Sequence, residues 1–141
     1  MNADLLQFGR RILAEQPFSV LLGTELTAFA PGRAELTLAV RREHQQQHGF
    51  VHGGVVSYLA DNALTYAGGS VLPQQGVVTS EYKINYLRPA IGQTLVARAS
   101  VQYAGRTQAV CRCDVFAVNQ GEEKLCATAQ GTIVPLGAAP E

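Results

Sequence analysis

The fold of this chain is decided by the stretch His48-Gly-Phe-Val-His-Gly-Gly-Val-Val-Ser-Tyr-Leu-Ala-Asp-Asn-Ala-Leu-Thr-Tyr-Ala-Gly-Gly69. Between Gly53 and Leu72 only one side chain is charged, that of Asp61. Apolar side chains fall on nearly every face of a helix drawn through this segment, and a helix that is apolar all round is a buried one. We therefore expect a buried helix over residues 54–68, ended by Gly68-Gly69.

The sequence before and after this helix predicts mainly strands. A short amphipathic helix is expected first, over residues 3–15, ended by Pro17. Residues 42–52 are polar and irregular and are expected to form a loop. Apolar and polar residues alternate in most of the remaining segments, as in half-buried strands. The six predicted strands are residues 18–30 (with Gly23 as a candidate bulge), 33–41, 77–88, 94–104, 107–118 and 124–134.

These elements together predict one α+β fold. An antiparallel sheet with a single apolar face needs a cover, and the buried helix is the obvious one. We expect a hotdog fold, an antiparallel sheet of about six strands wrapped around one long central helix, as a single domain over residues 1–141. The N-terminal helix lies within residues 1–16, and residues 137–141 form a frayed tail. One sheet cannot cover so apolar a helix, which favours a homo-oligomer.

Composition indicates which binding partners and which cellular compartment to expect. The formal net charge is zero, so nothing in the charge balance indicates nucleic acid binding. The longest apolar run contains Asp61, Asn62 and glycines, which makes a membrane-spanning helix unfavourable. The charged N-terminus does not resemble a signal peptide. Three cysteines without zinc-type spacing favour a reduced, cytoplasmic protein without a metal site.

The candidate chemistry lies at the start of the buried helix and in its middle. Asp61 is the candidate base or nucleophile, because a carboxylate in an apolar wall has lost water and needs a use or a partner. The alternative is a structural aspartate bonded to a loop. Gly53 and Gly54 leave the N–H groups of the helix start unobstructed, so the Gly53 N–H is a candidate oxyanion donor. The alternative is a tight turn.

Three other polar residues could support this chemistry. His52 is expected to orient the loop more than to transfer protons. His52 and Asp61 are nine residues apart, about 13 Å along a helix, so a shared site requires a second subunit or a folded-back loop. Gln46 and Thr79 could position water or simply lie on the surface. Cys111 and Cys113 share one strand face and are expected in the core.

The residues His52-Gly53-Gly54, Leu59, Asp61 and Ala63 resemble the H-G-G-x-x-x-x-L-x-D-x-A motif of PaaI-like hotdog thioesterases, of the 4-hydroxybenzoyl-CoA thioesterase group. The segment YKINYLRPA (82–90) and Gly105-Arg106 agree with the resemblance, which covers about residues 20–135.

The resemblance implies a dimer or dimer of dimers that hydrolyses acyl-CoA thioesters without metal or cofactor. It implies that Asp61 is the catalytic carboxylate, that the Gly53 N–H polarises the thioester carbonyl, and that the two come from different subunits. Thr79 falls where many relatives have a serine or threonine near the attacking water. Gln46 falls where many have asparagine, so this chain places a longer amide there.

The substrate is expected to bind along the same elements. Arg88 and Arg106 are candidate contacts for the CoA phosphates, since arginine suits phosphate geometry. The alternative for each is an ordinary surface charge. Tyr58, Tyr66 and Leu72 indicate an apolar pocket that fits an aromatic or a medium-chain acyl group. Two other functions remain open at this point, a hotdog hydratase or dehydratase acting on enoyl thioesters and a non-catalytic acyl-CoA sensor.

Overall fold

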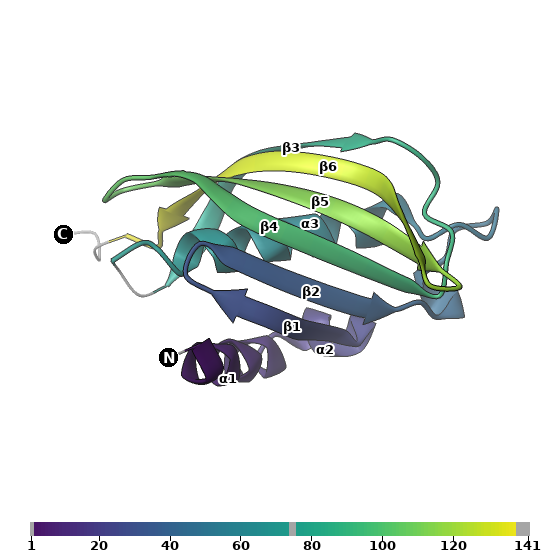
Figure 1. Ribbon diagram of the computed structural model, residues 1–141, viewed down its shortest axis with the longest axis horizontal. Helices are drawn as coiled ribbons and strands as arrows, with labels where there is room; N and C mark the ends of the chain where they lie inside the picture. The colour runs from purple at the N-terminus through teal and green to yellow at the C-terminus, as the bar shows by residue number, and fades with distance from the viewer. Residues whose placement is uncertain (1, 74–75, 138–141) are drawn as a thin grey trace.

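A computed structural model describes residues 2–73 and 76–137 (Figure 1). Its strands form one antiparallel sheet in the order β1-β2-β4-β5-β6-β3, and the long helix α3 lies in the concave side of that sheet. The expected α+β fold is confirmed. The elements are α1 (Asn2–Ala14), α2 (Pro17–Leu22), β1 (Thr24–Ala30), β2 (Arg33–Ala39), the short 3-10 helix η1 (Arg42–His44), α3 (Gly53–Gly69), β3 (Val77–Tyr86), β4 (Thr94–Ala104), β5 (Ala109–Asn119) and β6 (Glu122–Pro135).

The core forms where α3 meets the sheet. One face of the helix is fully buried against the apolar faces of the strands, whose side chains alternate in and out as the sequence predicts. The fully buried contributors from the helix are Leu59, Ala60, Ala63, Leu64 and Ala67, and those from the sheet include Leu36, Leu38, Leu95, Val115 and Ile133. Burial of this apolar surface is the main source of stability.

The expected strand over residues 18–30 is wrong in its first part. Residues 17–22 form the short helix α2, and the strand begins only at Thr24. Pro17 occupies the first turn of α2, where its missing N–H costs nothing, so this proline starts a helix as well as ending the previous one. Gly23 is not a bulge: it ends α2 with φ +81, a left-handed conformation that glycine adopts without strain.

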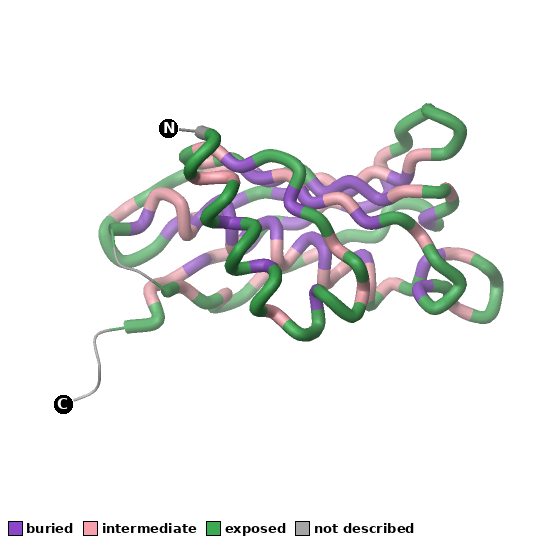
Figure 2. The backbone as a smooth tube through the Cα atoms, turned by 90° about the horizontal axis from the view of Figure 1, so that it is seen from below, coloured by how far each residue is buried: buried purple, intermediate pink, exposed green. Residues whose placement is uncertain are grey.

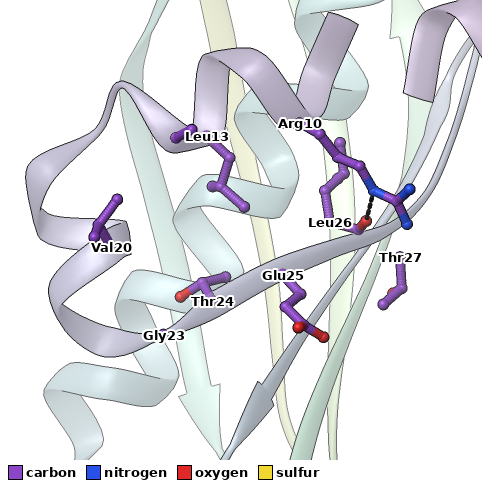
Figure 3. A pocket seen from close by; sticks show the side chains of 9 residues that line it. Arg10, Leu13, Val20, Gly23, Thr24, Glu25, Leu26 and Thr27 are labelled. Carbon is purple, nitrogen blue, oxygen red and sulfur yellow. Dashed lines mark hydrogen bonds between the residues drawn. The ribbon is translucent and has the colours of Figure 1, made fainter. Parts of the chain in front are cut away.

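Helix α1 covers the β1 edge of the sheet. The Nε–H of Arg10 donates to the main-chain oxygen of Leu26 at 3.0 Å, beside a cavity of about 560 Å³ between α1, α2 and β1 (Figure 3). The outer side of α1 is largely exposed, whereas the segments behind it are buried (Figure 2). This end of the sheet is therefore protected from pairing with another strand.

The opposite edge, β3, has no such cover within the described residues. It pairs with β6 on one side, and no strand or helix lies along its other side (Figure 1). Val78 and Tyr86 on this strand are 43% and 55% exposed. On the neighbouring face of α3, Ser57, Asp61 and Thr65 are only half-buried. A single subunit thus leaves one long edge and one helix face open.

Two expectations concern other parts of the chain. Of the predicted frayed tail, residues 138–141 lie outside the described residues. Over residues 2–73 and 76–137, none of the helices has both the length and the apolar character needed to cross a membrane.

The contact between α3 and β6 gives a test of this packing. A Cβ atom added at Gly68 would lie 2.7 Å from Cβ and Cγ1 of the buried Ile133. We expect Gly68→Ala to lower the free energy of unfolding by about 1–3 kcal/mol in urea denaturation, although alanine is the better helix former. The loss should be smaller in an Ile133→Ala background, and an unchanged midpoint would contradict the close packing.

Candidate active site

Asp61 lies on the half-buried face of α3 and is held by two threonines. The Thr79 hydroxyl of β3 donates to Asp61 Oδ1 at 2.6 Å. Thr65 Oγ1, one helical turn beyond Asp61, lies 2.9 Å from Thr79 Oγ1 and 2.8 Å from the main-chain oxygen of Asp61. No group among the described residues bonds the second oxygen, Oδ2. The carboxylate is therefore oriented through one oxygen and keeps the other for a substrate or a water.

The start of α3 leaves one backbone donor free. His52 is the N-cap, and its Nδ1 accepts from the Gly54 N–H at 2.8 Å. The Tyr86 hydroxyl donates to the main-chain oxygen of Gly53 at 3.1 Å. The Gly53 N–H makes no hydrogen bond with any described residue. An unpaired N–H at a helix start is suited to bind an oxyanion.

A cavity of about 370 Å³ lies beside this helix start. Three of the residues singled out from the sequence line it: Gln46, Gly53 and Arg88. Arg88 follows β3, is exposed and lines this cavity. The remaining lining is mostly apolar and is formed by Phe50, Val51, Val56, Tyr86, Leu87, Pro89, Ala90 and Cys126.

Gln46 is held within its own loop. Its side-chain oxygen accepts from the His48 N–H, and its main-chain N–H donates to the Phe50 oxygen at 2.9 Å. Its remaining amide group can face the cavity, but the side chain is not in contact with Asp61. The structure thus brings Gln46 to Gly53 and brings Thr79 to Asp61.

A single subunit keeps the acid and the donor apart. Gly53 and Asp61 are eight residues apart on one helix, about 12 Å along its axis. Asp61 does not line the cavity that contains Gly53, and no hydrogen bond joins it to His52. Within one subunit, Asp61 and the Gly53 N–H therefore do not share a cavity.

Two residues expected to bind substrate lie elsewhere. The Tyr58 hydroxyl is 2.6 Å from Ser19 Oγ and 2.8 Å from Thr24 Oγ1, in a polar network between α2 and α3 that also includes Gln16 and Asn62. Arg106 is exposed in the turn between β4 and β5, at the other end of the sheet from Arg88. Within one subunit only Arg88 adjoins the cavity.

The cysteines do not supply a nucleophile. Burial raises the pKa of the Cys126 thiol to about 11, so this thiol stays protonated at neutral pH although it lines the cavity. Cys111 and Cys113 are fully buried in the sheet, as the sequence predicts. In the part of the chain that the structure describes, no three His, Cys, Asp or Glu side chains are grouped to hold a metal ion.

Sequence reasoning missed three contacts. Thr65 and Tyr86 touch the site directly, and only the four-residue spacing of Thr65 from Asp61 could have indicated one of them. His44 is fully buried: its Nδ1 accepts from the Arg41 N–H, and its Nε2 donates to the Leu22 oxygen at 2.9 Å. It fixes the loop before α3 and is not free for proton transfer.

The chain is similar to known thioesterases in sequence and in fold. A family model described as Thioesterase superfamily matches residues 48–124. The acyl-coenzyme A thioesterase PaaI of Escherichia coli K12 is 35% identical over 105 residues, 72% of this chain and 71% of that protein. Human acyl-coenzyme A thioesterase 13 is 29% identical over 136 residues, 94% of each chain. A thioesterase family protein from Silicibacter pomeroyi has a similar structure, with a TM-score of 0.89 and 38% identity over 94% of this chain and 99% of that one.

The role of His52 as a helix cap can be tested by stability. We expect His52→Ala to lower the free energy of unfolding by about 1 kcal/mol, because the Gly54 N–H loses its acceptor. His52→Asn, which supplies a side-chain oxygen as acceptor in place of Nδ1, should retain most of the stability in the same urea titration. Equal losses in both variants would contradict the capping role.

Proposed function

The chain belongs to the thioesterase superfamily, and on this basis we propose that it hydrolyses acyl-CoA thioesters to a free acid and CoA. The observation that carries the proposal is the pairing of a half-buried carboxylate that has one free oxygen with an unpaired N–H at a helix start. Acyl transfer needs both parts, a group that attacks or activates water and a donor for the developing oxyanion.

Asp61 supplies the attacking side of the reaction. In one route Oδ2 removes a proton from water, whose oxygen bonds to the thioester carbon. In the other Oδ2 itself bonds to that carbon, giving an anhydride that water then hydrolyses. In both routes the carbon–sulfur bond breaks, and the CoA sulfur leaves as a thiolate that takes up a proton. The Thr79 hydroxyl keeps Asp61 oriented throughout.

Gly53 supplies the electrophilic side. Its N–H stabilises the negative charge that develops on the carbonyl oxygen, while Tyr86 and His52 fix the peptide groups around it. The CoA moiety extends through the cavity beside the helix start, where Arg88 binds a phosphate. Arg106 contributes from the neighbouring subunit or not at all, given its place at the other end of the sheet.

The complete site is a dimer site. Strand β3 is an uncovered edge that carries half-exposed apolar side chains, and such an edge pairs readily with another strand. Antiparallel pairing of two β3 strands about their middle lays the Thr79 end of one beside the Tyr86 end of the other. Thr79 holds Asp61 and Tyr86 holds Gly53, so this pairing places the acid of one subunit beside the donor of its partner.

The geometry favours hydrolysis over hydration of an enoyl thioester. A hydratase needs a histidine free to move a proton beside its acid. The Nδ1 of His52 is occupied by the Gly54 N–H, and both ring nitrogens of His44 are bonded in the loop. The mechanism needs no metal or cofactor beyond CoA in the substrate. The three free, buried thiols support a reducing, cytoplasmic setting.

Asp61→Asn tests the proposal. We expect this variant to keep its fold and to lose about 100- to 10,000-fold in kcat with acyl-CoA substrates, followed by thiol release. Asp114→Asn is the matched control, because Asp114 is also half-buried and its Oδ1 also accepts from a threonine, Thr128, at 2.7 Å, but on the outer face of the sheet. A near-native rate for Asp61→Asn would reject the assignment.

Gly53 allows the donor and the shared site to be tested together. Gly53→Pro removes the N–H and adds a ring, at a first helical position where proline is tolerated and after a residue with ψ 137 that suits it. Gly53→Ala keeps the N–H, and its Cβ would meet the Tyr86 ring at 3.6 Å, an ordinary contact. We expect a loss of about 100- to 1,000-fold for the proline variant and little change for the alanine variant.

Mixing subunits separates a shared site from a site within one chain. Dimers that combine one Asp61→Asn subunit with one Gly53→Pro subunit have one intact site and one doubly defective site. A random mixture should then regain roughly a quarter of the wild-type activity, because half of its two-fold dimers are mixed. If mixing restores nothing, both groups act within one subunit.

A further inference from the structure

Besides the cavity at the α1–β1 edge and the cavity at the start of α3, a further cavity lies between α1 and α3. It has a volume of about 550 Å³, within the range of small-molecule sites. One wall is α1, through Leu5, Phe8 and Ile12. The other wall is formed by the last turns of α3 and the segment that follows, through Asn62, Thr65, Tyr66, Gly69, Ser70, Leu72, Pro73, Gly76 and Val77. We call this cavity the α1 groove.

The α1 groove has no charged side chain among its described lining residues. Each of its polar side chains makes at least one hydrogen bond within the protein. Asn62 Nδ2 donates to Gln16 Oε1 at 3.1 Å, the Tyr66 hydroxyl donates to the Gly9 oxygen at 2.8 Å, and Ser70 Oγ donates to the Ala67 oxygen at 2.7 Å. The groove is therefore suited to a hydrocarbon group.

The α1 groove is lined by two residues next to the candidate catalytic carboxylate on α3. Thr65 lines it and lies 2.9 Å from Thr79, whose hydroxyl holds Asp61. Asn62, the next residue after Asp61, lines it as well. A thioester carbon placed at Asp61 thus has the groove on one side, while its CoA sulfur points toward the helix start of the partner subunit.

The shape of the groove indicates an elongated occupant. Leu5, Phe8 and Ile12 follow one face of α1 over seven residues, about 10 Å of helix. Phe8 and Ile12 are 49% and 37% exposed, although they are large apolar side chains. The Tyr66 hydroxyl ties α1 to α3 through Gly9, so this wall is fixed in place.

We propose that the α1 groove binds the acyl group of the substrate and that α1 thereby selects linear, medium-length aliphatic acyl-CoA thioesters. This inference rests on the proposed function. Each methylene that enters the groove should raise kcat/KM by about fourfold, the transfer free energy of one buried CH2 group expressed as a rate ratio. The gain should stop at the chain length that fills the groove.

The test is a series of straight-chain substrates from acetyl-CoA to dodecanoyl-CoA. With the wild-type protein, kcat/KM should climb through the medium chain lengths and then level off. Phe8→Ala and Ile12→Ala should flatten this climb, so that the ratio of kcat/KM for the medium chains to kcat/KM for acetyl-CoA falls, because the longer chains reach α1 and an acetyl group does not. Leu21→Ala is the matched control: it removes an isomer of the Ile12 side chain from α2, where Leu21 is 67% exposed and outside the groove.

The outcomes separate the inference from the function on which it rests. Flattening by the α1 variants, with a normal profile for Leu21→Ala, supports the groove. Wild-type profiles in both α1 variants, or equal flattening in Leu21→Ala, would overturn it while thioester hydrolysis stands. Phenylacetyl-CoA is assayed beside the series as an aromatic substrate. A wild-type protein that cleaves phenylacetyl-CoA but no straight-chain member would overturn the linear acyl assignment and leave the proposed function standing, whereas one that cleaves neither would reject both. Because Phe8 is half exposed, Phe8→Ala is expected to fold, and the acetyl-CoA rate confirms it.

Discussion

The helix α3 needs apolar cover around most of its circumference, and one six-stranded sheet covers only part of it. Leu59, Ala63 and Leu64 are fully buried against the strands, whereas Asp61 and Thr65 lie on the half-buried side. The polar side chains of the helix gather on this open strip because the buried strip admits none without a large desolvation cost. The requirement that stabilises the fold therefore also decides where a reactive carboxylate can be placed.

Much of the architecture could be predicted from local patterns. The run around Asp61 predicts the central helix, and the alternation in residues 94–104 and 107–118 predicts two central strands, because period and burial are linked directly in these segments. Local patterns do not predict the helix in the first part of segment 18–30. Its apolar residues suit a strand or a helix equally well, and Pro17 favours the start of a helix.

The sequence indicates which residues belong to the candidate site, but it does not indicate which of them are in contact. Asp61, Gly53 and Thr79 can be singled out by residue type and position. The contact of Thr79 with Asp61 depends on the register of β3 against α3, and that of Tyr86 with Gly53 depends on the path of the chain after α3. Both contacts join segments distant in sequence, for which a hydrophobic period carries no information.

The two edges of the sheet are treated differently, and this asymmetry explains how the chain can assemble. At β1 the edge is closed by α1, whose Arg10 satisfies the Leu26 carbonyl. At β3 the edge is open and bears the two residues that hold Asp61 and Gly53. Among the described residues, β3 is therefore the edge that is open to strand addition, and in the dimer that we propose this pairing would bring the separated halves of the site together. Helix α1 thus has two effects. It covers the β1 edge, and its Phe8 and Ile12 line the α1 groove opposite α3.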